Sequence, residues 1–158
     1  MRELHPEAIR LIRHYEGFTL EAYRCPAGFW TNDTGNLITR DINAPKPPDI
    51  SEGEARELFR KNTLVAIQSV LRLISIPLTD GQFGALVDFT FNLGGGALQA
   101  STLRRRVNEG RHEEATREFA KWVYAGGIKL RGLVVRRKND SEMYMSDLAY
   151  SPGKAIAP

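Results

Sequence analysis

The sequence predicts a mainly helical α+β fold with one small region of strands near the N-terminus. Apolar residues recur at helical spacing over most of the chain, one early segment lacks this period, and a proline-rich run follows that segment. At 158 residues the chain can bury a core without a metal or a disulfide, and its single cysteine excludes an internal disulfide. We expect no cofactor, and the three histidines lie too far apart in the sequence to suggest a metal site.

The N-terminal part should form a helix and then short strands. Apolar residues at helical spacing predict a helix over residues 3–15 that ends near Gly17. Over residues 18–43 this period is lost, and glycines among aromatic residues indicate short strands joined by turns. Three prolines within residues 43–48 favour an extended connector, because proline lacks an amide donor and restrains its neighbours.

The rest of the chain should be helical, with clear signals where helices begin and end. Capping-box patterns open one helix at Ser51, which runs to about Ser75, and another at Thr79. The second is rich in apolar residues and should be a buried central helix that the glycines at 94–96 end. Three further helices are expected over residues 101–108, 112–124 and 133–148, and residues 151–158 should form a loose tail.

These elements suggest one domain over residues 1–150 that is divided into two lobes. A small lobe should take about residues 15–50, and the long helix over residues 51–75 should join it to a larger helical lobe at about 78–148. The helix over residues 3–15 should pack on the larger lobe.

A carboxylate, a thiol and a hydroxyl follow one another after the first predicted helix, in the order Glu16-x8-Cys25-x5-Thr31. This order closely resembles the phage lysozymes, a glycoside hydrolase family with Glu-x8-Asp-x5-Thr, in one branch of which cysteine takes the middle position. Two later segments, LTDGQFGALVDFTFNLGGGALQASTLRRRVNEG and EFAKWVYAGG, are similar to the family's larger lobe in the same order. The resemblance therefore implies a lysozyme-like fold over nearly the whole chain.

The resemblance also implies an activity: hydrolysis of the β-1,4 bond between N-acetylmuramic acid and N-acetylglucosamine in peptidoglycan. Glu16 would give a proton to the leaving oxygen, which requires a buried setting that keeps its carboxyl protonated. Thr31 would orient the attacking water through its hydroxyl. On local evidence alone Glu16 could be a solvated residue that ends a helix, and Thr31 a β-branched strand residue.

Cys25 stands where most of the family has an aspartate that holds water and balances positive charge on the sugar. A thiol is only partly ionised at pH 7, so it would need help to act as a base. It is also a good nucleophile that could attack the sugar directly. Three roles therefore stay open for Cys25: a base, a nucleophile, or a small apolar filler.

The chain departs from the family after Thr31. Where the family usually has Ile-Gly-Tyr-Gly-His, this chain has Asn32-Asp33-Thr34-Gly35-Asn36. This difference affects the expected activity more than the expected fold. Asp33 brings a carboxylate near the expected cleft, where it could contact substrate or replace the missing aspartate, although Asn-Asp-Thr-Gly is also ordinary turn chemistry.

Two side chains in the larger lobe are candidates for substrate contact. Asn92 matches a position that lines the family's cleft, and it could instead be the C-cap of the central helix. Trp122 could contact sugar or peptide, although large aromatic residues on a helix more often belong to the core. The basic clusters at 104–106 and 136–138 could meet anionic polymers, but such clusters usually form a solvated helix face.

The resemblance implies a phage endolysin that acts on bacterial peptidoglycan and lyses the host, as a monomer with no nucleic-acid partner and no membrane-embedded segment. The first residues are too charged for a signal peptide, so we expect the protein in the host bacterial cytoplasm, from which it reaches the wall after a holin has permeabilised the membrane. The main alternative is a catalytically impaired peptidoglycan-binding protein with a lysozyme fold, and a weaker one is a DNA-binding helical protein. The net charge of +3 is too small to choose among anionic partners.

Overall fold

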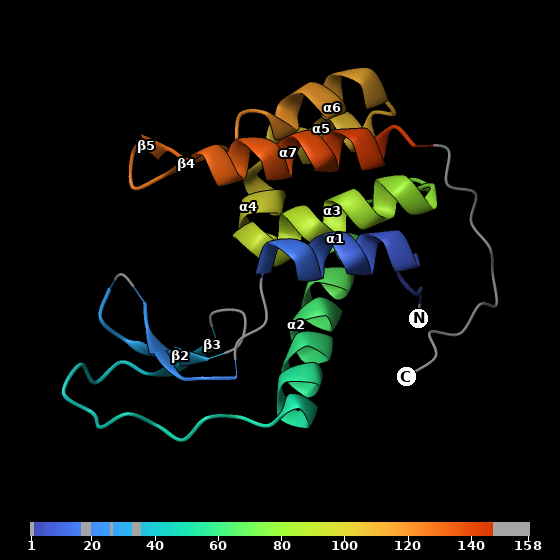
Figure 1. Ribbon diagram of the computed structural model, residues 1–158. Helices are drawn as coiled ribbons and strands as arrows, with labels where there is room; N and C mark the ends of the chain where they lie inside the picture. The colour runs from blue at the N-terminus through green and yellow to red at the C-terminus, as the bar shows by residue number, and fades with distance from the viewer. Residues whose placement is uncertain (1, 17–19, 26, 33–35, 147–158) are drawn as a thin grey trace. The chain divides into compact units, whose positions relative to one another are not determined.

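The computed structural model describes residues 2–16, 20–25, 27–32 and 36–146 (Figure 1). The chain divides into two compact units. The first, here called the small unit, is Arg13–Leu64; the second, the helical unit, consists of Met1–Ile12 and Val65–Pro158. The mainly helical α+β class predicted from the sequence is confirmed, including the small antiparallel sheet near the N-terminus.

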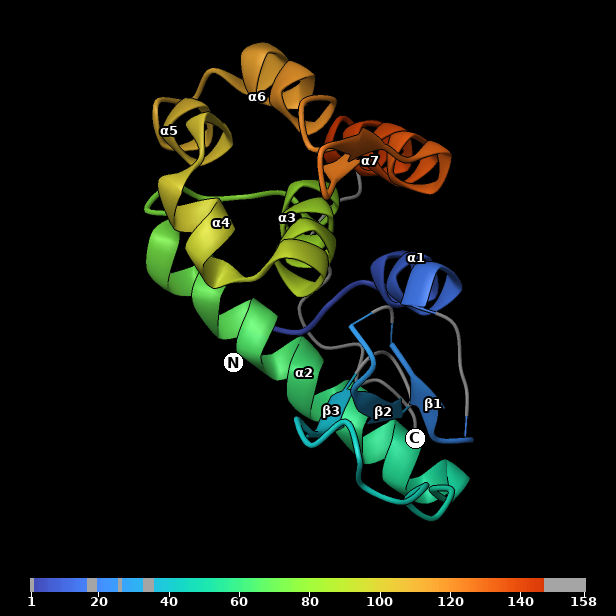
Figure 2. The ribbon, with the colours of Figure 1, turned by 90° about the vertical axis from the view of Figure 1, so that its left-hand side faces the viewer.

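The small unit contains a three-stranded antiparallel sheet in the order β1-β2-β3 (Figure 2). Tyr23 is paired with Thr31, and Thr31 in turn with Leu37. The unit also holds the end of helix α1 and the first part of helix α2. The bounds of these elements are α1 Pro6–Glu16, β1 Tyr23–Arg24, β2 Trp30–Asn32, β3 Asn36–Thr39 and α2 Glu52–Leu73.

Helix α2 begins where the sequence predicts. The hydroxyl of Ser51 accepts a hydrogen bond from the Glu54 amide at 3.2 Å, and the Glu54 carboxylate accepts one from the Ser51 amide at 2.8 Å. This reciprocal pair satisfies two amide donors that the first turn of a helix leaves unpaired, which confirms the capping box. Before it, residues 45–50 are neither helix nor strand, as the prolines require.

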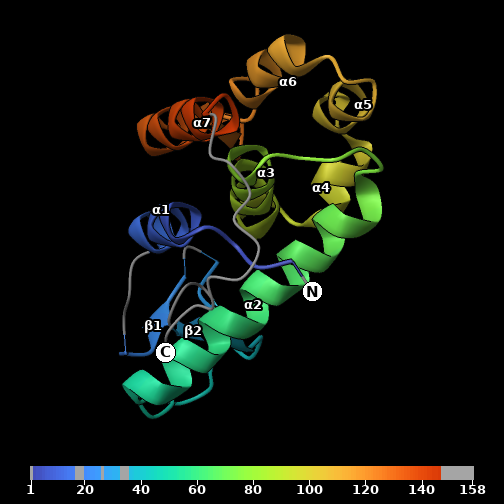
Figure 3. The same cartoon turned by 90° about the vertical axis from the view of Figure 1, so that its right-hand side faces the viewer.

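The helical unit is built around α3, against which α4 and α7 pack (Figure 3). Thr79 and Gln82 form the second predicted capping box at the start of α3, and the side chains of Phe83, Leu86 and Phe89 are fully buried. A β-carbon added at Gly84 would lie 2.6 Å from that of Ala8, so this glycine allows α1 and α3 to approach closely. The helices are α3 Asp80–Leu93, α4 Gly95–Ala100, α5 Thr102–Asn108, α6 His112–Phe119 and α7 Arg131–Tyr144.

The structure differs from the prediction in two places. Gly94 ends α3 as expected, but the chain becomes helical again at once and forms α4. The helix predicted over residues 112–124 ends at Phe119 instead, and Tyr124–Ala125 (β4) pairs with Ile128–Lys129 (β5). Strands are therefore not confined to the early region, and that part of the prediction was wrong.

The hairpin of β4 and β5 has a local cause. Two residues, Gly126 and Gly127, connect the strands, and both have positive φ, at 57° and 79°. A two-residue hairpin turn with positive φ at both positions matches the twist of the strands, and glycine adopts it without steric cost.

Within the described residues, no helix is both long enough and apolar enough to cross a membrane. The tail predicted at residues 151–158 lies outside the described residues.

Candidate active site

Glu16 is the last residue of α1, at the point where the sequence places the end of the first helix. Its side chain is half-buried, and its Oε1 atom is shielded from solvent. Burial disfavours a charged carboxylate, and so does the negative end of the helix dipole at a C-terminus.

Cys25 and Thr31 lie on the same face of the sheet. Tyr23 pairs with Thr31, and beyond this pair the Cys25 amide donates to the carbonyl of Phe29 at 2.9 Å. Side chains alternate between the two faces along a strand, so Cys25, two residues after Tyr23, shares the face of Thr31. The register of β1 and β2 therefore brings together the second and third residues of the sequence motif.

The side chains of Arg24 and Trp30, a cross-strand pair, lie on the opposite face of the sheet. The guanidinium of Arg24 lies 4.4 Å from the centre of the Trp30 ring, and its Nη1 donates to the carbonyls of Gly28 and Ile42 at 2.7 and 2.8 Å. The indole Nε1 of Trp30 donates to the carbonyl of Ala44 at 2.8 Å. These contacts hold the backbone of Gly28 and the 42–44 segment against the side chains of Arg24 and Trp30.

Thr31 is only 4% exposed, and its hydroxyl donates to the carbonyl of Tyr23 at 3.0 Å. Because a hydroxyl has a single proton, Thr31 can meet a further partner as an acceptor. Cys25 is a free, half-buried thiol. Asp33, the other candidate in this segment, lies outside the described residues.

Asn92, in the last turn of α3, is oriented by an arginine. Nη2 of Arg137 donates to its Oδ1 at 2.9 Å. The C-cap of α3 is Gly94, whose amide bonds the carbonyl of Thr90, so the alternative interpretation of Asn92 as a C-cap was wrong. With its oxygen occupied by Arg137, the amide of Asn92 has its two N–H donors for other partners.

The basic cluster at 136–138 is not a solvated face, and this interpretation was also wrong. Arg136 and Arg137 are only 4% and 1% exposed, whereas Lys138 is exposed. Arg136 forms a two-pronged pair with Asp88 at 2.7 and 2.9 Å, and Nε of Arg137 lies 3.2 Å from Asp140. Arg137 also stacks over Phe89, at 5.3 Å from the ring centre.

The sequence held two signals for this buried cluster, an acid inside an apolar stretch and an acid at helical spacing from an arginine. Asp88 interrupts the apolar stretch Leu86–Phe91, and Asp140 follows Arg137 at the three-residue helix spacing. A charged residue on a helix face that is otherwise buried normally needs a partner of opposite charge. Burial raises the pKa of Asp140 well above its ordinary value, and the negative charge of Asp88 adds to the shift.

Trp122 follows α6 and packs on the aromatic core of the helical unit. Its ring meets that of Phe89 edge to face, with the centres 5.2 Å apart. Phe89 meets Phe119 in the same manner at 5.8 Å. The side chain of Trp122 is half-buried, so part of it remains accessible for contact with a ligand.

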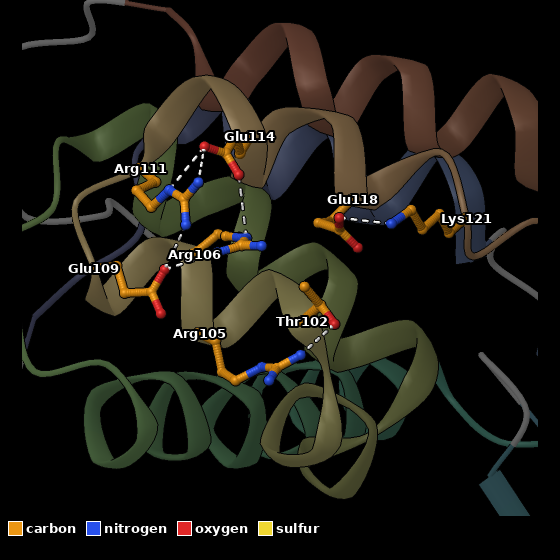
Figure 4. Close-up of polar contacts among 8 residues, drawn as sticks. All are labelled: Thr102, Arg105, Arg106, Glu109, Arg111, Glu114, Glu118 and Lys121. Carbon is orange, nitrogen blue, oxygen red and sulfur yellow. Dashed lines mark hydrogen bonds and ion pairs between the residues drawn. The ribbon is translucent and has the colours of Figure 1, made fainter.

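The second basic cluster, at 104–106, lies on α5, and its Arg106 joins a group of acids and arginines that extends to α6 (Figure 4). Arg106 pairs with Glu109 at 3.0 Å and with Glu114 at 3.3 Å. Arg111 pairs with the same two glutamates. Of the arginines behind the DNA-binding alternative, Arg106 is paired with acids here, and Arg136 and Arg137 are buried beside α3. Arg105 is exposed and donates to the hydroxyl of Thr102 at 3.0 Å. Among the described residues, no group of three or more His, Cys, Asp or Glu side chains could hold a metal ion.

Known proteins resemble this chain over most of its length. Residues 13–140 match the family model described as "Phage lysozyme". The endolysin of Bacillus phage B103 is 34% identical over 140 residues, covering 87% of this chain and 52% of that protein, so the chain spans about half of its length. The endolysin of Acyrthosiphon pisum secondary endosymbiont phage 1 is 34% identical over 141 residues, or 86% and 93% of the two chains.

A solved structure shows the same fold. The muramidase domain of SpmX from Asticaccaulis excentricus superimposes with a TM-score of 0.80 at 30% identity, covering 92% of this chain and 99% of that one. The lysozyme-like fold expected from the sequence is therefore confirmed.

Proposed function

The chain belongs to the phage lysozyme family, and from this premise we propose that it cleaves the β-1,4 bond between N-acetylmuramic acid and N-acetylglucosamine in bacterial peptidoglycan. Family membership makes it a glycoside hydrolase of the muramidase type. One observation in the small unit carries the specific proposal. A shielded carboxyl ends α1, and a thiol and a hydroxyl share one face of the sheet.

Glu16 is the proposed general acid. Hydrolysis of a glycosidic bond needs a proton for the leaving oxygen and a water at the anomeric carbon. Thr31 is the proposed water-positioning residue. Because its own proton is used on the carbonyl of Tyr23, it accepts a hydrogen bond from the water, which leaves a lone pair of that water for attack on the sugar.

Cys25 is proposed to contact the same water as Thr31, because the two side chains share one face of the sheet. Its alternatives are attack on the sugar by sulfur and simple packing. We predict that Cys25→Asp keeps or raises the rate of peptidoglycan hydrolysis, since a carboxylate binds water and balances positive charge better than a thiol does. Rates of Cys25→Asp and Cys25→Ser are compared on purified cell walls. A large loss in Cys25→Asp together with a trapped glycosyl–enzyme adduct in the wild type would favour sulfur as the nucleophile.

Three further residues are proposed to contact the substrate. The amide donors of Asn92 suit the acetamido and hydroxyl oxygens of a sugar, and the orientation imposed by Arg137 would reduce the entropic cost of binding. The accessible part of Trp122 offers a flat apolar surface to a sugar or peptide. Asp33 is proposed from the sequence alone as a further carboxylate near the substrate.

The decisive test is Glu16→Gln, which keeps the size of the side chain and removes the proton donor. We expect the rate of reducing-end release from purified peptidoglycan to fall by about a hundredfold or more. Glu21→Gln is the matched control, because Glu21 is an exposed glutamate of the same unit. Its rate should stay at the wild-type level, and both variants should unfold at the wild-type temperature. Unchanged hydrolysis by Glu16→Gln would remove Glu16 from this role.

A second candidate function is peptidoglycan binding without turnover. The observation that favours it is the departure of residues 32–36 from the family pattern, together with Cys25 at the aspartate position. Dye release from labelled peptidoglycan and cosedimentation with unlabelled walls separate the two functions. Binding without release supports the second candidate, whereas release that depends on Glu16 excludes it.

We propose that cleavage of the wall lyses the bacterial host, with a holin-type membrane lesion giving the enzyme access from the host cytoplasm. The support is the resemblance to proteins named endolysins. Expression in bacteria with and without a membrane-permeabilising protein tests this route. Lysis that occurs equally in both cultures would contradict it.

A further inference from the structure

Arg137 lies where α7 packs on α3, and its guanidinium contacts two buried acids and one candidate substrate residue (Figure 3). The side chain is only 1% exposed. Its Nε lies 3.2 Å from Asp140 and its Nη2 lies 3.9 Å from Asp88. The same Nη2 donates to Oδ1 of Asn92 at 2.9 Å. A buried arginine therefore holds a side chain that is only half-buried in the last turn of α3.

This contact determines which way the amide group of Asn92 faces. A guanidinium has N–H donors and no acceptor, so only the oxygen of the amide can face it. The guanidinium is also planar, and the contact of Nε with Asp140 fixes the direction of the other N–H groups. A flipped amide would place N–H groups of Asn92 against those of Arg137. Asn92 therefore keeps its two donors turned away from the arginine.

Trp122 is linked to the same arginine through Phe89. The guanidinium carbon of Arg137 lies 5.3 Å from the centre of the Phe89 ring, and that ring meets the Trp122 ring edge to face at 5.2 Å. Edge-to-face contacts between aromatic rings are directional, so the position of Phe89 restrains the ring of Trp122. Arg137 thus contacts one candidate substrate residue directly and the other through a single ring.

Stability alone is a weak reason for a buried arginine at this position. Removing two charges from water is costly, and well-packed apolar residues of similar size often replace a buried ion pair without loss of stability. Arg2, in the same unit, offers a comparison: it pairs with Asp80 at 2.9 Å and lies over the ring of Phe83 at 4.4 Å. It also donates to the carbonyl of Leu78, whereas Arg137 donates to a candidate substrate residue.

We propose that Arg137 is a positioning residue that fixes Asn92 and Trp122 together as preformed substrate contacts; the inference rests on the proposed function. Because its own side chain is buried, Arg137 acts through these two residues and does not touch the substrate. Side chains that are already fixed lose less conformational freedom when they bind. Loss of Arg137 should therefore weaken substrate binding and leave the chemical step unchanged.

The test replaces the arginine in two ways. Arg137→Lys keeps a cation beside Asp140 but lacks the planar fork that reaches Asn92 at the same time. Arg137→Met with Asp140→Asn removes the charge and leaves no buried carboxylate unpaired. We expect both to raise KM for purified peptidoglycan by about tenfold, or 1.4 kcal/mol, with kcat unchanged. Arg2→Met with Asp80→Asn is the matched control and should keep the wild-type KM. Circular dichroism confirms that each variant is folded.

A second background separates positioning from a general structural role. In a chain with Asn92→Ala and Trp122→Ala, the proposed contacts are already absent, so adding Arg137→Lys should change KM by less than about twofold. A structural role would raise KM by the same factor in both backgrounds, and that result would overturn the proposal. An equal rise in the Arg2 control, an unchanged KM in both Arg137 variants, or a fall in kcat alone would also overturn it.

Failure of the proposed activity gives a different result. If the wild type does not hydrolyse peptidoglycan, cosedimentation with purified cell walls gives a dissociation constant that takes the place of KM. Weaker binding by Arg137→Lys that disappears in the chain without Asn92 and Trp122 supports the positioning role although turnover has failed. If the wild type hydrolyses the wall and the effects add, only the positioning role is overturned. If the wild type neither hydrolyses nor binds walls, both proposals are overturned.

Discussion

Two clusters in the helical unit have the same charged groups in different settings. One is the buried cluster of Asp88, Arg136, Arg137 and Asp140 between α3 and α7. The other is the surface cluster of Arg106, Glu109, Arg111 and Glu114 on α5 and α6 (Figure 4). Each has two arginines and two acids, so the difference between them isolates the effect of burial.

In the buried cluster each charge depends on its partner. Removing a charge from water is costly, and the attraction between the partners offsets this cost only while the pair is intact. In the surface cluster water and salt screen the same interactions, and long side chains lose freedom when they are held in one geometry. The comparison predicts that losing one acid is severe in the first cluster and minor in the second.

The two clusters also shift their acids in opposite directions. Burial, with the nearby charge of Asp88, raises the pKa of Asp140. In the surface cluster the hydrogen bond from Arg106 lowers the pKa of Glu109. The pairing therefore favours the charged form of an acid at the surface, whereas desolvation favours the neutral form of the acid inside.

The largest effect should come from Asp88→Asn. The substitution keeps the shape of the side chain and leaves Arg136 buried without its two-pronged partner. We expect a loss of about 3–5 kcal/mol in the free energy of unfolding, measured by urea denaturation at pH 7. Glu114→Gln in the surface cluster is the control and should lose less than about 1 kcal/mol. Equal losses in the two variants would break the comparison.

How much of the fold the sequence could predict depends on how far apart along the chain the interacting residues lie. The starts of α2 and α3 depend on residues three positions apart, so the capping boxes were visible in the sequence. The pairing of Arg136 with Asp88 joins residues 48 positions apart, and only packing of α7 on α3 brings them together. The hairpin was missed because residues 112–124 can continue as a helix unless the Gly126–Gly127 turn imposes strand pairing.

In the candidate site too, local features could be predicted from the sequence, whereas contacts between distant residues could not. A local motif placed Glu16 at the end of a helix and Thr31 among the early strands, as observed. The hydrogen bond from Thr31 to Tyr23 depends on strand register, and the orientation of Asn92 depends on Arg137 45 residues away. Neither contact can be inferred from spacing along the chain, although both determine which donors and acceptors remain for a substrate.

The smallest and sharpest difference between the clusters should appear in the pH dependence of stability. An acid with a raised pKa in the folded state contributes stability below its ordinary value, and this contribution is lost as the pH rises through the folded-state pKa. Asp140 is in this class, with an ordinary value of 3.8. Glu109 has a lowered pKa, so its contribution is present above its ordinary value of 4.5 and is lost as the pH falls.

Asp140→Asn and Glu109→Gln should therefore show opposite slopes. The free energy of unfolding of the wild type minus that of Asp140→Asn should decrease as the pH is raised from about 4 to about 8. The corresponding difference for Glu109→Gln should decrease as the pH is lowered from about 6 to about 3, and in about 1 M salt it should vanish, because the Debye length is then only about 3 Å. The difference for Asp140→Asn should persist in that salt, since its partners are shielded from solvent. Slopes of the same sign, or equal sensitivity to salt, would mean that burial does not separate the two clusters.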